Sequence, residues 1–333
     1  MRIQLKPEIK KLFFLLLLFV FSFTTNAQKL TLYNTLNFPD ETANTVALSP
    51  DGKTLICGFD DGQIKAFNIH SGKELYASNR HGGTIHTIKF TNDGKFFLTG
   101  SQDKIAILWR TEDGKILKNY TGHNQGVWAV AFSPDKTYVF TGGGDNAVMV
   151  WESVSTKRYR YLWGHGDRIY DIEITPNGKY AVSGSMDKTI KIWDYKRKQE
   201  VKSLKGHMHT IRTLDISPDG KYILSGSQDN SIRLWNFESG ENIRTYRINH
   251  WNVLSVNFSP DGKYFVSSHW DKTFVLWKTD STTPVTKNQE HTGAVTEAVF
   301  SDSGKFLITC SANEVKIWET GLAVMESASS NDK

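Results

Sequence analysis

Histidine, a hydroxyl residue, aspartate and tryptophan recur together along this chain at nearly constant spacing. His165, Ser183 and Asp187, for example, are followed by Trp193. A histidine placed between a hydroxyl and a carboxylate is the arrangement that activates the nucleophile of serine hydrolases. Five units carry the set: His81/Thr99/Asp103/Trp109, His123/Thr141/Asp145/Trp151, His165/Ser183/Asp187/Trp193, His207/Ser225/Asp229/Trp235 and His250/Ser267/Asp271/Trp277. Because an enzyme needs only one active site, five copies favour a structural role, and we expect no catalytic residue among them.

The spacing of these sets reveals an internal repeat. The tryptophans from Trp109 to Trp277 recur every 42 residues, and Trp318 follows after 41. Phe67 stands 42 residues before Trp109. Seven units of this length nearly fill the 306 residues that follow Ala27. The sequence therefore predicts a fold made of seven similar units.

Within one unit the local pattern is that of short strands. Residues 169–174 alternate between apolar and polar side chains over the length of a strand. Residues 176–179 form a turn signal with a glycine, and we expect further strands at 180–183, 189–193 and 201–204. Four antiparallel strands make a blade that cannot bury its faces alone, so the blades must stack around an axis. The predicted fold is all-β, a seven-bladed propeller with four-stranded antiparallel blades.

Three short motifs carry a resemblance to a known family. Gly164-His165, Gly184-Ser185-Met186-Asp187 and Ile192-Trp193-Asp194 resemble the Gly-His and Trp-Asp signatures of WD-repeat (WD40) β-propellers. The resemblance implies that the tryptophan strand is third from the central channel. It also implies that the recurring His, hydroxyl, Asp and Trp form a buried hydrogen-bond relay in each blade. Members of this family often close the ring with their N-terminal segment, so we expect residues 31–37 to pair with residues 315–319.

The first and last units depart from the pattern. Unit one has Cys57 at the hydroxyl position and Phe67 at the tryptophan position, and unit seven has Asn313 where the acid is expected. Cys57 and Cys310 are the only cysteines, and the repeat places them in neighbouring sheets. Packed sheets lie about 10 Å apart, whereas a disulfide needs Cα atoms within about 7 Å. We expect no disulfide bond between them.

Metal and cofactor sites are not indicated by the sequence. Histidines one blade apart are too distant to share an ion, and the chain has no Cys-x-x-Cys or His-x-x-x-His pair. Segments such as Asp60-Asp61-Gly62 lack the alternating acids and closing Glu of a calcium loop. We therefore expect neither a metal nor a cofactor.

The first 27 residues contain the three parts of a secretory signal peptide. A basic head reaches Lys11, an apolar run covers residues 12–23, and small or polar residues lead to Ala27. The apolar run is shorter than the roughly 20 residues of a transmembrane helix, so we expect no membrane span after cleavage. The predicted organisation is cleavage after Ala27, one propeller over residues 28–322 and a disordered tail at 323–333. The ending Thr-Asn-Ala-Gln resembles exported proteins of Gram-negative bacteria, which predicts a secreted or periplasmic protein.

The charge of the predicted mature chain argues against nucleic-acid binding. Removing four basic residues and one acid with the signal peptide lowers the formal net charge from +5 to +2. Proteins that bind nucleic acid usually present a clearly basic stripe. We expect no nucleic-acid partner.

One position of the repeat varies strongly and predicts a binding surface. By the resemblance, it opens the innermost strand at the mouth of the channel. Its residues are Asn44, His86, Trp128, Tyr170, Arg212, Leu254 and Thr296. With neighbouring positions added, the predicted partner-binding residues are His86, Trp128, Arg168, Tyr170, Met186, Arg212 and Trp270. Trp, Tyr and Arg are enriched among the residues that dominate binding energy in protein interfaces. The alternative is that Trp128 and Tyr170 plug the channel by packing on each other.

Two functions are compatible with these patterns. The first is a non-catalytic scaffold that is exported from the cytoplasm, is monomeric by itself, and binds a protein or peptide partner on the rim of the channel. The second is a small-ligand binder or an enzyme of the propeller type. That second reading requires convergent carboxylates or histidines at the mouth, where His86, Arg212 and Asp60 are the only ionisable candidates by sequence.

Overall fold

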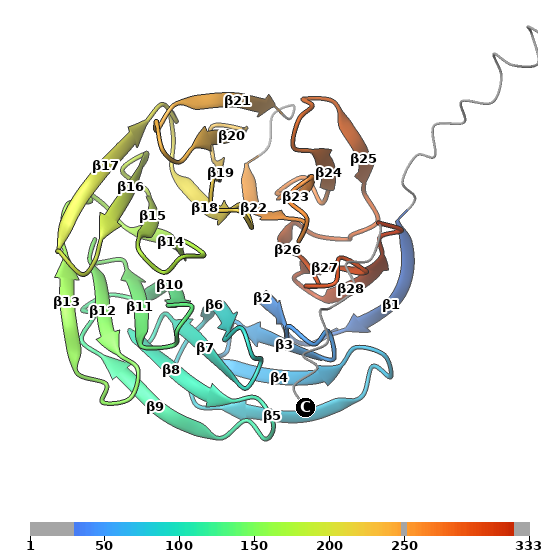
Figure 1. Cartoon of the computed structure of the whole chain (residues 1–333). Coiled ribbons are helices and arrows are strands. Elements are labelled where there is room, and N and C mark those ends of the chain that lie inside the picture. The colour runs from blue at the N-terminus through green and yellow to red at the C-terminus, as the bar shows by residue number, and fades with distance from the viewer. Residues whose placement is uncertain (1–29, 248–251, 323–333) are drawn as a thin grey trace, which may run out of the picture.

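The computed structural model describes residues 30–247 and 252–322. The predicted signal segment, the predicted tail and His250 lie outside the described residues. Strands in the described part form seven four-stranded antiparallel sheets, which surround a central opening (Figure 1). The seven blades follow the 42-residue repeat, so the predicted fold is confirmed. No helix long and apolar enough to cross a membrane occurs within 30–247 and 252–322.

Each blade runs from an innermost strand at the channel to an outermost strand at the perimeter. The innermost strands are β2 (Ala43–Leu48), β6 (Ile85–Phe90), β10 (Val127–Phe132), β14 (Ile169–Ile174), β18 (Ile211–Ile216), β22 (Val253–Phe258) and β26 (Val295–Phe300). The second strands are β3 (Thr54–Phe59), β7 (Phe96–Ser101), β11 (Tyr138–Gly143), β15 (Ala181–Ser185), β19 (Tyr222–Ser227), β23 (Tyr264–His269) and β27 (Phe306–Ser311).

The tryptophans lie on the third strands, as expected. These are β4 (Gln63–Asn68), β8 (Ile105–Arg110), β12 (Val148–Glu152), β16 (Thr189–Asp194), β20 (Ser231–Asn236), β24 (Phe274–Lys278) and β28 (Glu314–Glu319). The outermost strands are β5 (Glu74–Asn79), β9 (Ile116–Thr121), β13 (Arg158–Leu162), β17 (Gln199–Lys205), β21 (Asn242–Arg247), β25 (Pro284–Asn288) and β1 (Thr31–Asn37).

Ring closure joins the two ends of the described chain. Strand β1 pairs antiparallel with β28, with Thr31 opposite Glu319 and Asn37 opposite Glu314. The first strand therefore completes the last blade, and the predicted pairing is confirmed (Figure 1). Leu36 of β1 packs in a buried cluster with residues of blades one and seven. Opening the ring exposes this cluster, and that cost favours the closed form.

The hydrophobic core is divided among the interfaces between neighbouring blades. The cluster between blades four and five, for example, joins Ile190 and Ile192 to Ile211 and Leu214. In five blades the second strand carries a glycine where it approaches the next blade, whereas blade six has Ser268 and blade seven has Cys310 there. A Cβ on Gly226 would lie 2.5 Å from Cγ1 of Val253 in the next blade. The recurring glycine therefore sets how tightly two blades pack.

Hydrogen bonds also connect one blade to the next along the channel. The innermost strand has no partner on its channel side, which leaves backbone N–H groups without a strand to bond. Side chains of the preceding blade accept from them: Leu214 N donates to Asp171 Oδ2 at 2.7 Å and Phe258 N donates to Asp215 Oδ2 at 2.6 Å. Asp171 and Asp215 thereby satisfy backbone groups at the centre of the ring.

Candidate functional site

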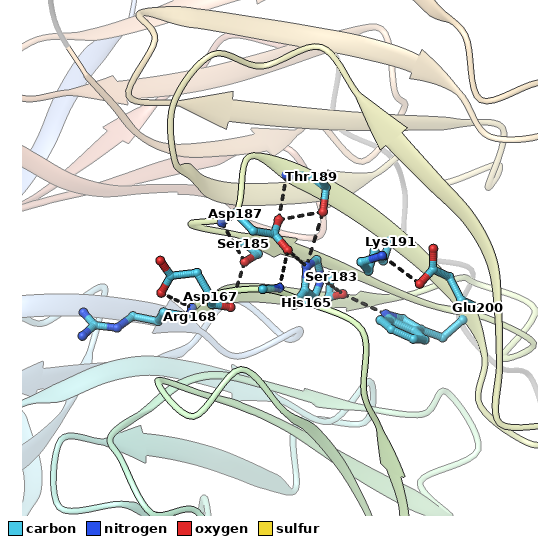
Figure 2. A network of polar contacts seen from close by, with 11 residues as sticks. His165, Asp167, Arg168, Ser183, Ser185, Asp187, Thr189, Lys191 and Glu200 are labelled. Atoms are coloured by element: carbon cyan, nitrogen blue, oxygen red, sulfur yellow. Dashed lines mark hydrogen bonds and ion pairs between the residues drawn. The ribbon is translucent and has the colours of Figure 1, made fainter.

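The recurring polar set forms continuous hydrogen-bond networks inside the blades. In blade four, Trp193 Nε1 donates to Ser183 Oγ at 2.8 Å, and the Ser183 hydroxyl lies 2.7 Å from His165 Nε2. His165 Nδ1 lies 2.7 Å from Asp187 Oδ2, and Figure 2 shows this chain of contacts. The carboxylate only accepts, so Nδ1 carries the hydrogen and Nε2 accepts from Ser183. One tautomer therefore satisfies every member of the network.

The Asp187 carboxylate is the most heavily bonded member. It also accepts from Gly166 N at 2.9 Å, from Thr189 N at 2.9 Å and from the Thr189 hydroxyl at 2.6 Å. Burial alone would raise the pKa of Asp187, but the hydrogen bonds from His165, Thr189 and Gly166 lower it well below its usual value. The ionised carboxylate is thus the form that the folded blade stabilises.

Three other blades contain the same network. Blades two, three and five join His81, Thr99, Asp103 and Trp109, then His123, Thr141, Asp145 and Trp151, and then His207, Ser225, Asp229 and Trp235. The hydroxyl residue at the centre is fully buried in each. In each blade the hydroxyl contacts the tryptophan and the histidine of the same blade, so the network stabilises the interior of that blade.

Blade six is arranged differently. Trp277 Nε1 donates to Ser267 Oγ at 2.8 Å, but the Ser267 hydroxyl contacts Nε2 of His269 at 2.9 Å. Asp271 contacts Thr273 and Lys287 instead of a described histidine. His269 occupies the position that holds serine in most other blades, a departure visible in the repeat register that the sequence reasoning did not use.

Blade seven retains the network through a residue that the sequence reasoning missed. His291 Nε2 contacts Thr309 Oγ1 at 2.7 Å, and His291 Nδ1 contacts Glu314 Oε1 at 3.0 Å. The expectation that Asn313 stands in for the acid is therefore wrong, because the amide of Asn313 instead donates to the carbonyl of Phe38 at 3.3 Å. The turn is one residue shorter, and the longer side chain of Glu314 covers the difference.

The cysteines lie at the junction of these two terminal blades. Cys57 and Cys310 belong to one hydrophobic cluster, and both are free and buried. Burial raises the pKa of the Cys57 thiol well above its usual value, and the neighbouring Cys310 adds to this effect. Both thiols are therefore held in the neutral, unreactive form.

Most of the predicted rim residues meet at one mouth of the channel. His86 stacks on Trp128 with ring centroids 3.6 Å apart, and Trp128 packs edge-on against Tyr170 at 5.3 Å. The guanidinium of Arg168 lies 4.6 Å from the centroid of Trp128, and that of Arg212 lies 4.7 Å from the centroid of Tyr170. These five residues, defined here as the mouth cluster, form one continuous stack across blades two to five.

A cavity of about 540 Å³ opens beside this stack. Its walls include His86, Trp128, Tyr170 and Arg212, and also Trp270, which is 58 % exposed. Met186, which is exposed, and Arg168, which contacts the Trp128 ring, do not line the cavity. The mouth cluster thus fills part of the opening, as the plugging alternative expected, and leaves an open cavity with an aromatic wall.

Below the mouth cluster, the channel holds charged side chains that the sequence reasoning missed. The prediction that His86, Arg212 and Asp60 are the only ionisable residues at the mouth is wrong. Lys89, Asp171 and Glu297 line the cavity, whereas Asp60 does not. Lys89 of blade two lies 2.5 Å from Glu173 of blade four, so this ion pair crosses the channel. These residues could have been found from the sequence, because a charged residue within an innermost strand must face the channel or a neighbouring blade.

The carboxyl groups around Lys89 hold their protons unusually well. Burial raises the pKa of Asp171 to about 6, of Asp215 to about 7 and of Glu297 to about 8. Burial alone would lower the pKa of Lys89, but the charges of Glu173, Asp171 and Asp215 together raise it above its usual value. The ammonium group therefore remains charged and offsets part of the negative charge in the channel.

The described residues contain no group of three or more His, Cys, Asp or Glu side chains that could hold a metal ion.

Comparison with known proteins agrees with the geometry. The model of the WD domain, G-beta repeat, matches seven consecutive segments: residues 31–68, 72–110, 114–152, 156–194, 198–236, 240–278 and 282–319. A comparison with curated protein sequences finds no match. Propellers of this kind generally serve as protein-interaction scaffolds and are typically not enzymes. With seven matched repeats and seven four-stranded blades closed by its own first strand, this chain belongs to the WD40 repeat family.

Proposed function

We propose that this protein is a non-catalytic scaffold that binds a protein or peptide partner at the mouth cluster. The observation that carries the proposal is the stack of His86, Trp128 and Tyr170 with two guanidinium groups beside an open cavity. Aromatic side chains and arginines held at a cavity edge are the anchors that dominate protein interfaces. Their contacts with each other hold them in place, so little side-chain entropy is lost on binding.

The docking proposal predicts a large effect of a single side chain. Trp128→Ala should weaken partner binding by about 2 kcal/mol or more, which is roughly 30-fold or more in affinity, because the anchor and its stacking partners are lost together. The measurement is the dissociation constant of a partner that is first captured from the native host, identified by mass spectrometry and then purified. Circular dichroism establishes that the variant is folded.

A matched control separates docking from general surface effects. Trp163 follows the outermost strand of blade three and is 60 % exposed, so Trp163→Ala removes the same side chain outside the mouth cluster. This variant should bind like the parent. Equal binding by Trp128→Ala and the parent would remove the mouth cluster from the function.

We further propose that the protein is exported with its first 27 residues removed. The basic head, the short apolar run and the small-residue exit support this proposal. Mass spectrometry of the protein from its native host should find a chain that starts at Gln28 in the secreted or periplasmic fraction. A chain that retains Met1 and stays in the cytoplasmic fraction would contradict it.

A further inference from the structure

Two guanidinium groups at the mouth have no carboxylate partner among the described residues. Arg168 contacts the Trp128 ring and reaches Tyr170 Oη at 3.4 Å, while its Nε–H is buried without a hydrogen bond. Arg212 lies 4.7 Å from the centroid of Tyr170, the same ring that the guanidinium of Arg168 approaches at 5.7 Å. Both side chains are partly buried. A charge withdrawn from water without a partner is destabilising, and natural proteins usually avoid it.

Some partly buried cations among the described residues are paired with a carboxylate, whereas others, such as Lys118, Arg160 and Arg233, have no such ion pair. Lys65 lies 2.6 Å from Glu41, and Lys191 lies 2.7 Å from Glu200. The ammonium of Lys89 contacts Glu173 in the channel. What distinguishes Arg168 and Arg212 is that both lie against one aromatic stack at the channel mouth, and this concentration of positive charge points to a ligand that supplies negative charge.

The local electrostatic potential also favours an anion. Burial lowers the pKa of His86 to about 4; its hydrogen bond with Gln102 opposes this shift, and the positive charges of Arg212 and Arg168 add to it. His86 is therefore neutral at physiological pH, and the two arginines are always charged. Asp171 and Glu297 also line the cavity, but their raised pKa values, about 6 and about 8, reduce the negative charge that they set against an anion.

The contacts of the arginines leave their strongest donors available. Stacking on an aromatic ring uses the flat face of a guanidinium group, whereas its N–H donors point outward in the plane. A carboxylate accepts two such donors side by side, and this geometry is stronger and more specific than a single hydrogen bond.

We propose that the mouth cluster binds an acidic peptide, whose aspartate or glutamate carboxylate is held by Arg168 and Arg212 while a neighbouring apolar residue packs on Trp270. This proposal rests on the docking function proposed above and names the chemistry of its partner. The aromatic surface of Trp270, exposed beside the cavity, provides the apolar contact.

The test uses two end-blocked peptides that differ at one position. The probes are acetyl-Gly-Ser-Leu-Gly-Glu-Gly-Leu-Ser-Gly-amide and its counterpart with Gln in place of Glu, titrated against the full folded domain by NMR. The Glu peptide should bind at least about tenfold more tightly than the Gln peptide, because hydrogen bonds from arginine to a carboxylate are stronger than those to an amide. It should also raise the pKa of His86, because a bound carboxylate offsets the charge of the arginines.

Variants and a small acid complete the design. Arg168→Gln combined with Arg212→Gln should reduce the preference for Glu to less than about threefold. Arg197→Gln changes an exposed arginine on the turn between β16 and β17 and should leave the preference intact. Equal binding of the two peptides by the parent protein, or no binding at millimolar concentration, overturns the proposal. If glutarate binds as tightly as the Glu peptide, the site recognises a small acid, and the proposal that the ligand is a peptide is overturned.

Comparing Trp128→Ala with the double arginine variant distinguishes failure of the acidic-peptide proposal from failure of the docking proposal. A purified partner that is lost with Trp128→Ala but retained by the double arginine variant leaves docking intact and removes the acidic class. A partner retained by both variants removes both proposals. A partner lost with both variants supports both.

Discussion

Asp187→Ala is expected to lower the free energy of unfolding by about 3 kcal/mol or more. The substitution removes a carboxylate that accepts from His165, Gly166 and Thr189 inside blade four. It leaves the Nδ1–H of a buried imidazole and the N–H of Gly166 without an acceptor, and such groups destabilise a folded protein strongly. Urea-induced unfolding, followed by tryptophan fluorescence, measures the change.

The first blade supplies the control for this prediction. Asp61 occupies the same position of the repeat, but the first unit has no relay histidine, and the Asp61 carboxylate accepts from Gln63 N at 2.9 Å. Asp61→Ala therefore removes a turn contact alone, and we expect a loss of about 1 kcal/mol. Equal losses for the two variants would show that the network of blade four contributes no more than a turn contact.

The pH dependence of the same residue follows from its lowered pKa. A carboxyl group whose pKa is lower in the folded than in the unfolded protein stabilises the fold above its ordinary pKa of 3.8. That contribution is lost as the pH falls toward the folded value. The stability difference between the parent and Asp187→Ala should therefore shrink below about pH 4.

Repetition explains why so much of the architecture can be predicted from the sequence. A constant period places equivalent residues in equivalent strands, so the four strands of one unit determine all seven blades. The position of Trp193 on the third strand and the pairing of residues 31–37 with the last blade follow from the family resemblance together with this register. Strand β15 begins at Ala181, one residue later than expected, which leaves the register unchanged.

The same regularity fails where a unit departs from the period. In blade seven the shorter turn moves the carboxylate from position 313 to Glu314, and a fixed count along the chain cannot anticipate that shift. In blade six His269 contacts Ser267, so the network depends on which side chain reaches the hydroxyl. Both cases depend on side-chain length and direction, which a periodic pattern does not specify.

Contacts across the channel are further removed from sequence patterns. The repeat correctly places Tyr170 and Arg212 in neighbouring blades at one level of the ring. It does not show that Lys89 reaches past one blade to Glu173, because that contact joins residues 84 positions apart and depends on the width of the closed ring. The charge of the channel therefore emerges only from the assembled fold.

Lys89→Met is expected to lower the free energy of unfolding by about 1–3 kcal/mol at pH 8, because several carboxyl groups surround an ammonium group that solvent still screens in part. The ammonium of Lys89 lies among the carboxyl groups of Asp171, Glu173, Asp215 and Glu297, and its loss leaves their negative charges without a cation in the channel. Urea unfolding at several pH values measures the change. Lys136→Met is the control, because Lys136 pairs with Asp93 on the surface at 2.8 Å, where such pairs contribute about 1 kcal/mol or less.

The size of the loss should depend on pH, and its direction follows from the raised pKa values. A carboxyl group with a raised pKa favours the folded state at low pH, and this contribution is lost as the pH rises through the folded value. For Glu297 the loss runs from its ordinary 4.5 to about 8, so the parent protein loses stability over that interval. At pH 5, Asp171, Asp215 and Glu297 are protonated, fewer negative charges remain, and Lys89→Met should be less damaging.

Adding Glu297→Gln to Lys89→Met tests this explanation directly. Glutamine resembles protonated glutamate in shape but cannot ionise, so the double variant should recover part of the lost stability at pH 8 and little at pH 5. A loss that is equal at both pH values, with no recovery in the double variant, would mean that Lys89 acts through the packing of its aliphatic stem. Recovery confined to high pH would instead mean that the ammonium group counters the mutual repulsion of carboxylates that closure of the ring brings together.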